Sequence, residues 1–261
     1  MIIDTHCHLH DRALADIRDV LRTSHVHDVW GMVAVGCDPE TNARTLATAI
    51  SSPKAVWAAF GFHPDWRHLG GEHLERVEEQ IVRHHSRLVA VGEIGLPWYS
   101  LDGASDVAAL MTRGRQHLDR LLGLAARYDL AVSIHAPHGV AADAFEALKH
   151  HGIERAVFHW HKAPVDVTRA IVDAGYLVSI TPEVVYRERD RELVAALPLE
   201  SLLVESDTPW RYRGEFEGFP SGPWLAGRAA EEIAKIKRLP VDDAMFELTS
   251  NACRVFDLPW N

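Results

Sequence analysis

Short apolar runs recur eight times along the chain, and each is followed by a longer stretch with the apolar spacing of a helix. The runs are nearly continuous in apolar residues, as expected for parallel strands that are covered on both faces. Eight strands that alternate with helices specify an α/β protein, and the count of eight favours a single closed (β/α)8 barrel, or TIM barrel. The predicted strands are 1–6, 30–37, 56–63, 88–95, 130–136, 155–160, 176–181 and 202–208.

An open, doubly wound sheet is the alternative arrangement of the same elements. Such a sheet normally carries a glycine-rich phosphate loop after its first strand, where this chain reads THCHLHD. No internal repeat, low-complexity tract or linker divides the 261 residues, a length that suits one large domain. We therefore expect one domain over residues 1–261. A helix should follow strand eight from about Trp224, and a short terminal helix with a tail should complete the chain.

The composition is that of a soluble globular protein, with 47% hydrophobic and 25% charged residues. No apolar run approaches the roughly 20 residues of a membrane span, and the N-terminus lacks the pattern of a secretory signal. We therefore expect a cytoplasmic protein with no membrane association and no obligate protein partner. The net charge of −10 argues against broad adhesion to nucleic acid. Metal ions could still supply local positive charge where a phosphate binds.

Histidines and carboxylates fall at the carboxyl ends of the predicted strands, where barrel enzymes carry their active sites. His6 and His8 share a face of the first strand because strand side chains alternate, and His10 is expected in the following loop. A barrel gathers strand ends that are far apart in the sequence into one ring, and polar groups buried there need partners. The residues at these ends are His6, His8, His63, Glu93, His135, His159, Glu205 and Asp207.

Imidazole and carboxylate together suit divalent ions such as zinc, manganese, iron or nickel. Glu93 is placed to hold two ions through its two oxygens, and ions about 3.5–4 Å apart can share a hydroxide that acts as the nucleophile. Asp207 could bind one ion and take the proton from the attacking water, so Glu93 and Asp207 are the expected catalytic residues. His63 is either a substrate contact or a turn residue before Pro64. Glu205 is expected to support a ligand rather than to be one.

These residues resemble the TatD family of metal-dependent hydrolases, within the amidohydrolase-like barrels. The resemblance runs through DTHCHLHD, GFHP, GEIGLPWY, LLVESDTPW and TSNACRVFDL. It implies a deoxyribonuclease with two divalent metal ions, which could be zinc, manganese or magnesium. By this resemblance, one ion is held by His6, His8, Glu93 and Asp207, and the other by Glu93, His135 and His159.

Departures from the family pattern after strands four, five and six leave the substrate open. Pro97 stands where an aspartate is usual, and Trp160-His161-Lys162-Ala163 follow strand six in place of Cys-Phe-Ser-Gly. Ala136-Pro137 replace a usual Ser-Arg, which removes a fork-like phosphate donor. Cations of neighbouring loops could compensate, namely Lys162, Arg187, Arg211 and Arg213.

The expected function is hydrolysis of phosphodiester bonds in DNA, above all at single-stranded ends, with His63, Lys162 and Trp98 as expected substrate contacts. Aromatic residues near the strand ends could stack on unpaired bases at roughly 1–3 kcal/mol per base, or could close the rim of the barrel. They are Trp98, Tyr99, Trp160, Trp210 and Tyr212.

Two other functions fit the same residues. The first is hydrolysis of a small-molecule amide, ester or lactone at the same metal centre, which the missing arginine and the acidic charge favour. The second is a metal-binding scaffold without catalysis. The presence of both Glu93 and Asp207 counts against a scaffold.

Overall fold

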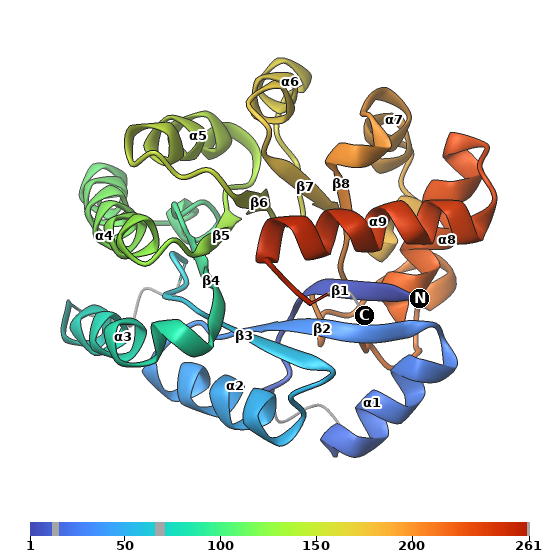
Figure 1. Ribbon diagram of the computed structural model, residues 1–261. Coiled ribbons are helices and arrows are strands. Elements are labelled where there is room, and N and C mark those ends of the chain that lie inside the picture. Colours follow the sequence, from blue (N-terminus) through green and yellow to red (C-terminus); the bar gives the residue numbers. More distant parts are fainter. Residues whose placement is uncertain (12–15, 66–70, 260–261) are drawn as a thin grey trace.

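The computed structural model describes residues 1–11, 16–65 and 71–259, and eight parallel strands form one sheet there in sequence order. Helices surround the sheet, which is the predicted TIM barrel (Figure 1). Residues 260–261 of the predicted tail lie outside the described residues. The strands are β1 (Ile2–Cys7), β2 (Val29–Val35), β3 (Val56–Phe60), β4 (Leu88–Gly95), β5 (Ala131–His135), β6 (Ala156–Phe158), β7 (Leu177–Ile180) and β8 (Leu202–Val204).

The helices follow the strands in turn, and some of them begin at an aspartate whose side chain caps the first turn. Asp38, for example, accepts hydrogen bonds from the backbone of Glu40 and Thr41 at the start of α2, and Pro39 occupies its first turn. No helix in the described ranges is long and apolar enough to cross a bilayer. The α-helices around the strands are α1 (Ile17–Val26), α2 (Pro39–Ser51), α3 (Gly71–His84), α4 (Val107–Arg127), α5 (Ala141–His150), α6 (Val165–Asp173), α7 (Glu188–Ala196) and α8 (Leu225–Lys237). Short 3-10 helices are η1 (His85–Arg87), η2 (Tyr99–Leu101), η3 (His138–Val140), η4 (Pro182–Val185), η5 (Leu199–Ser201) and η6 (Gly214–Phe216).

Several strands are shorter than the apolar runs that predicted them, and they lose residues at their carboxyl ends. β6 ends at Phe158 and β8 at Val204, although strands were expected to continue to residues 160 and 208. In the turns that follow, Trp160 has φ 40° and Asp207 has φ 43°, a left-handed conformation that no strand adopts. Polar side chains at this end of the barrel are therefore positioned by turns as well as by strands.

The seam between β1 and β8 is closed largely by side chains. Thr5 Oγ1 donates to the last carbonyl of β8 at 2.9 Å. The buried carboxyl group of Asp4 accepts from the backbone N of Ser206 at 3.0 Å and from its hydroxyl at 2.6 Å. Beyond the strand, the backbone N of Asp207 donates to the carbonyl of His6 at 2.9 Å. The seam thus brings together residues that lie about 200 positions apart in the sequence.

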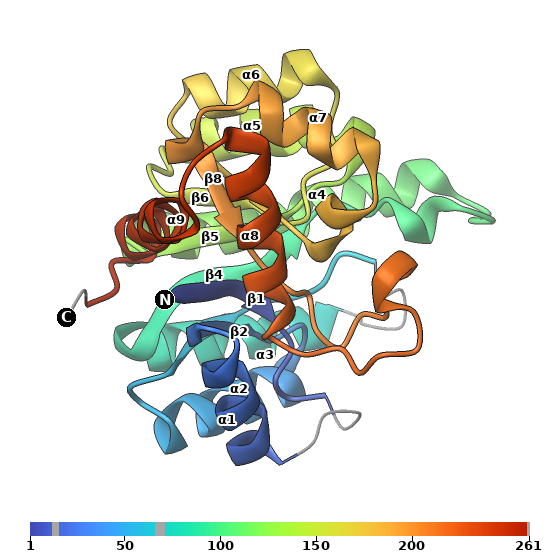
Figure 2. The same ribbon diagram turned by 90° about the vertical axis from the view of Figure 1, so that its right-hand side faces the viewer.

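Helix α9 (Val241–Phe256) closes the opposite end of the barrel, beside the start of β1 (Figures 1 and 2). It is the predicted terminal helix, although with 16 residues it is not short. Phe256 is buried in an apolar cluster with Ile3 and other residues that point into the barrel. Asn251 Nδ2 donates to the carbonyls of Leu199 and Leu202 at 2.9 and 3.0 Å, at the start of β8. The helix therefore closes this end of the barrel with apolar side chains, and it is hydrogen-bonded to the start of β8.

Candidate metal centre

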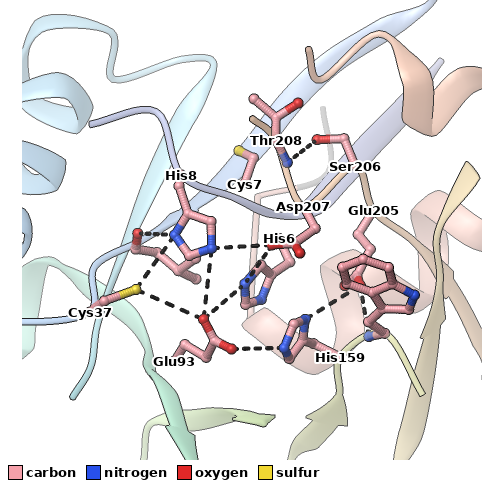
Figure 3. A network of polar contacts seen from close by, with 12 residues as sticks. His6, Cys7, His8, Cys37, Glu93, His159, Glu205, Ser206, Asp207 and Thr208 are labelled. Atoms are coloured by element: carbon pink, nitrogen blue, oxygen red, sulfur yellow. Dashed lines mark hydrogen bonds and ion pairs between the residues drawn. The ribbon is translucent and has the colours of Figure 1, made fainter. Parts of the chain in front are cut away.

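The buried carboxylate of Glu93, in β4, lies at the centre of a group of imidazoles at the carboxyl end of the barrel (Figure 3). Its Oε2 lies 3.5 Å from His6 Nε2 and 3.7 Å from His8 Nε2. Its Oε1 lies 2.7 Å from His135 Nδ1 and 2.8 Å from His159 Nε2. The two oxygens of one carboxylate therefore face two different pairs of imidazoles, one from the β1 end and one from the β5 and β6 ends.

Asp207 joins the group from the turn after β8. Its Oδ1 lies 3.2 Å from His8 Nε2 and 3.7 Å from His6 Nε2. His6 Nε2 is buried and has no hydrogen-bond partner among the described residues, a condition that costs free energy unless a ligand is bound. Imidazole nitrogens and carboxylate oxygens that converge in this way are the donor set of a divalent metal ion. The residues present thus fit a metal.

The loop after β3 contributes His63 and a second residue, Asp65, that the sequence analysis did not single out. His63 Nε2 lies 3.3 Å from the Glu93 carboxylate, and its Nδ1 accepts from the backbone N of Asp65 at 3.1 Å. Asp65 Oδ2 lies 3.2 Å from His135 Nε2. Asp65 Oδ1 accepts from two backbone N–H groups of the loop after β4. Asp65 thus links the loops after β3 and β4 to His135 at the end of β5. The sequence offered one signal for a role of Asp65, namely its position two residues after the histidine of GFHP.

Glu205 lies behind His159 as seen from Glu93. Its Oε1 is 3.4 Å from His159 Nδ1 and accepts from the backbone N of Trp160 at 2.7 Å, while Ser179 Oγ donates to its other oxygen. A carboxylate in this position holds an imidazole ring in one orientation and leaves the far nitrogen free to bind.

The electrostatic balance at the centre keeps both carboxylates ionised. Burial alone would raise the pKa of Glu93, but His63 and His159 hold that pKa well below its usual range. Burial likewise opposes ionisation of Asp207, and the hydrogen bond and charge of His8 lower its pKa nevertheless. Each carboxylate is therefore available as a ligand or as a proton acceptor.

A cleft of about 950 Å³ leads to this centre. Glu93, Asp207 and the histidines His8, His63, His135 and His159 line its inner end. Tyr99 and Trp210 line it with exposed rings, and Trp160 lies edge-on to Trp210 with 5.1 Å between ring centroids. Cations also reach the cleft, namely Lys162, Arg187 and Arg211. Of the expected substrate contacts, His63 and Lys162 therefore do line the cleft.

Two aromatic residues lie differently from the other three. Tyr212 is buried and its hydroxyl donates to the carbonyl of Ser206 at 2.6 Å, so its ring closes the barrel rim instead of facing a substrate. Trp98 is half-buried, with its ring 5.4 Å from that of His138, and it is not among the described residues that line the cleft. The sequence could not separate these positions from Tyr99, because neighbouring loop residues have no fixed alternation of faces.

Comparison with known proteins gives matches over nearly the whole chain. The model of the family described as TatD related DNase matches residues 3–257. An uncharacterized metal-dependent hydrolase of Haemophilus influenzae is 28% identical over 258 residues, which is 99% of this chain and 100% of that protein. The human protein named deoxyribonuclease TATDN3 is 28% identical over 98% of this chain and 94% of its own length. The crystal structure of YjjV, a TatD homologue from Escherichia coli, has a TM-score of 0.88 at 29% identity and covers 99% of this chain and 98% of its own.

Proposed function

The chain belongs to the family of TatD-related DNases and is a metal-dependent hydrolase, and from that premise we propose that it hydrolyses phosphodiester bonds of single-stranded DNA with two divalent ions. The observation that carries the proposal is the position of Glu93, whose two oxygens face separate pairs of imidazoles. His6, His8, Glu93 and Asp207 would hold one ion, and Glu93, His135 and His159 would hold the other.

Bound divalent ions would supply Lewis acidity toward a phosphoryl oxygen and would activate water near neutral pH. The residues of the chain position the reacting groups and move protons. Asp207 Oδ1, which lies 3.2 Å from His8 Nε2, accepts the proton of the attacking water. His63 accepts a backbone N–H at Nδ1, which leaves its Nε2–H to donate a hydrogen bond to a substrate oxygen.

The cleft supports DNA as the substrate. Tyr99 and Trp210 line it and are 54% and 53% exposed, so unpaired bases can stack on them at roughly 1–3 kcal/mol per base. Lys162 and Arg187 supply positive charge beside them, which the phosphates of a strand need. The name of the human relative also supports a deoxyribonuclease.

The proposal is tested by cleavage of an end-labelled single-stranded oligonucleotide. Protein stripped with a chelator should be inactive, manganese should restore cleavage, and Glu93→Gln should remain inactive with manganese present. Glu146→Gln removes an exposed carboxylate from α5 and serves as the matched control, with activity equal to that of the wild type. Cleavage that persists in Glu93→Gln would contradict the proposed centre.

A panel of nitrophenyl esters and lactones identifies the competing function. A wild-type protein that rebinds metal and cleaves these compounds, but no oligonucleotide, would be a hydrolase of small-molecule carbonyl centres. Turnover of no compound and no DNA by the metal-loaded protein would favour a scaffold.

A further inference from the structure

One buried carboxylate on the wall of the cleft, Glu183 in η4, joins the loops that follow β6 and β7. It accepts a hydrogen bond from Trp160 Nε1 at 3.1 Å and pairs with Arg187 Nε at 2.7 Å. Lys162 Nζ lies 3.6 Å from its Oε2 and 3.9 Å from the centroid of the Trp160 ring. All four side chains line the cleft that leads to Glu93. We call Trp160, Lys162, Glu183 and Arg187 the cationic wall.

The cationic wall carries more positive charge than its own carboxylate neutralises. Arg189 also approaches Glu183, but it is hydrogen-bonded to the adjacent Asp190, so these two charges offset each other. Two cations, Lys162 and Arg187, then share the single carboxylate of Glu183. At 3.6 Å the Lys162 ammonium lies beyond hydrogen-bond distance from that carboxylate, so its N–H donors are available to a ligand.

The cations of this wall are held in place before any ligand binds. The Lys162 side chain is only 12% exposed and packs over an indole, while Arg187 is tied to a buried acid. A cation fixed in this way loses little conformational freedom on binding, which favours affinity. The loop after β5 brings no cation near the centre, because Ala136 and Pro137 follow His135. The cationic wall therefore presents two fixed cations to an anionic group beside the centre.

We propose that the cationic wall is a subsite for a phosphate of the DNA strand other than the one that is cleaved. Lys162 and Arg187 donate to its oxygens, and a neighbouring base stacks on the exposed Trp210. Glu183 and Trp160 position the two cations. The inference rests on the proposed function and adds the group by which the substrate is held.

A binding experiment tests the subsite without DNA cleavage. Isothermal titration of chelator-stripped protein compares thymidine 5′-monophosphate with thymidine, so that no metal ion can bind the phosphate. The wild type should bind the monophosphate at least about tenfold more tightly, and Lys162→Gln and Arg187→Gln should each lose about tenfold of that preference. Lys149→Gln, which removes an exposed lysine of α5, is the matched control and should keep it. No preference in the wild type, or one that survives in both wall variants, would overturn the subsite.

A second experiment identifies the phosphate in a strand. Oligonucleotides that carry one uncharged methylphosphonate linkage, moved stepwise along the chain, or that lack the terminal phosphate, are cleaved by the wild type and by Lys162→Gln. One uncharged position should slow the wild type about tenfold and should slow the variant less, because only Arg187 still contacts that phosphate there. If that position is a linkage, the subsite binds an internal phosphate, and if it is the end of the strand, the subsite binds a terminal phosphate. Equal sensitivity of both proteins at every position would overturn the proposal. A wild type that prefers the monophosphate yet cleaves no DNA would keep the phosphate subsite and reject the nuclease function.

Discussion

The two ends of the barrel are built from the same eight strands but from opposite kinds of residue. At the α9 end the interior is apolar, and Ile3, Val255 and Phe256 are buried against one another and their neighbours. At the other end, imidazoles and carboxylates are buried around Glu93. Burial of apolar surface stabilises the fold by roughly 25 cal/mol per Å², whereas burial of unpaired polar groups costs free energy. Burial of apolar residues at the α9 end thus offsets the free-energy cost of burying polar residues at the other end.

Asp207→Asn should impair only the polar end, and it should give the largest effect on hydrolysis. Loss of both a ligand and the proton acceptor should reduce the hydrolysis rate about 10⁴-fold, or roughly 5.5 kcal/mol in activation free energy. Steady-state kinetics and metal content by atomic emission measure the change. Asp243→Asn, in the first turn of α9, is the matched control and should leave both unchanged. Full activity in Asp207→Asn would refute its role.

Phe256→Ala should disturb the packing of the α9 end alone. A cavity in the apolar cluster should lower the free energy of unfolding by about 3–5 kcal/mol, measured by urea denaturation. The activity per folded molecule should stay at the wild-type value, because α9 lies at the end of the barrel opposite the centre (Figures 1 and 2). A loss of specific activity at low temperature, where the variant is folded, would show that the two ends are coupled.

Metal binding should sharpen the comparison, because a bound ion makes the polar end contribute to stability. An ion present at 100 times its dissociation constant stabilises the folded state by about 2.7 kcal/mol. Thermal unfolding of the wild type should therefore shift upward when manganese is added to stripped protein. The shift should shrink in Glu93→Gln and persist in Phe256→Ala. An equal shift in Glu93→Gln would place the bound ion elsewhere.

Asp65→Asn should give the smallest effect, through the orientation of His135. The asparagine carbonyl can still accept from the loop after β4, but the charge facing His135 Nε2 is lost. We expect a roughly tenfold decrease in manganese affinity, with unfolding unchanged. Titration of manganese into the stripped variant measures it. A decrease in stability without a change in affinity would make Asp65 a loop anchor only.

The strand order and the barrel could be predicted because long apolar runs leave few other arrangements. The same order placed His6, Glu93 and Asp207 at one end without any knowledge of contacts. The contacts of Asp65 and Glu183 could not be predicted, because they form between turns that follow different strands. The sequence left two alternatives open for Tyr212, base stacking or closure of the rim, because residues in the turn after β8 do not follow strand alternation.

The seam between β1 and β8 also determines when the centre can form during synthesis. His6 and His8 are synthesised about 200 residues before Asp207. At about 5–20 residues per second, the two imidazoles exist for roughly 10–40 seconds before the turn that carries Asp207 has been made. A nascent chain therefore cannot assemble the complete ligand set. Binding of metal by all of these residues requires that the whole barrel has been synthesised.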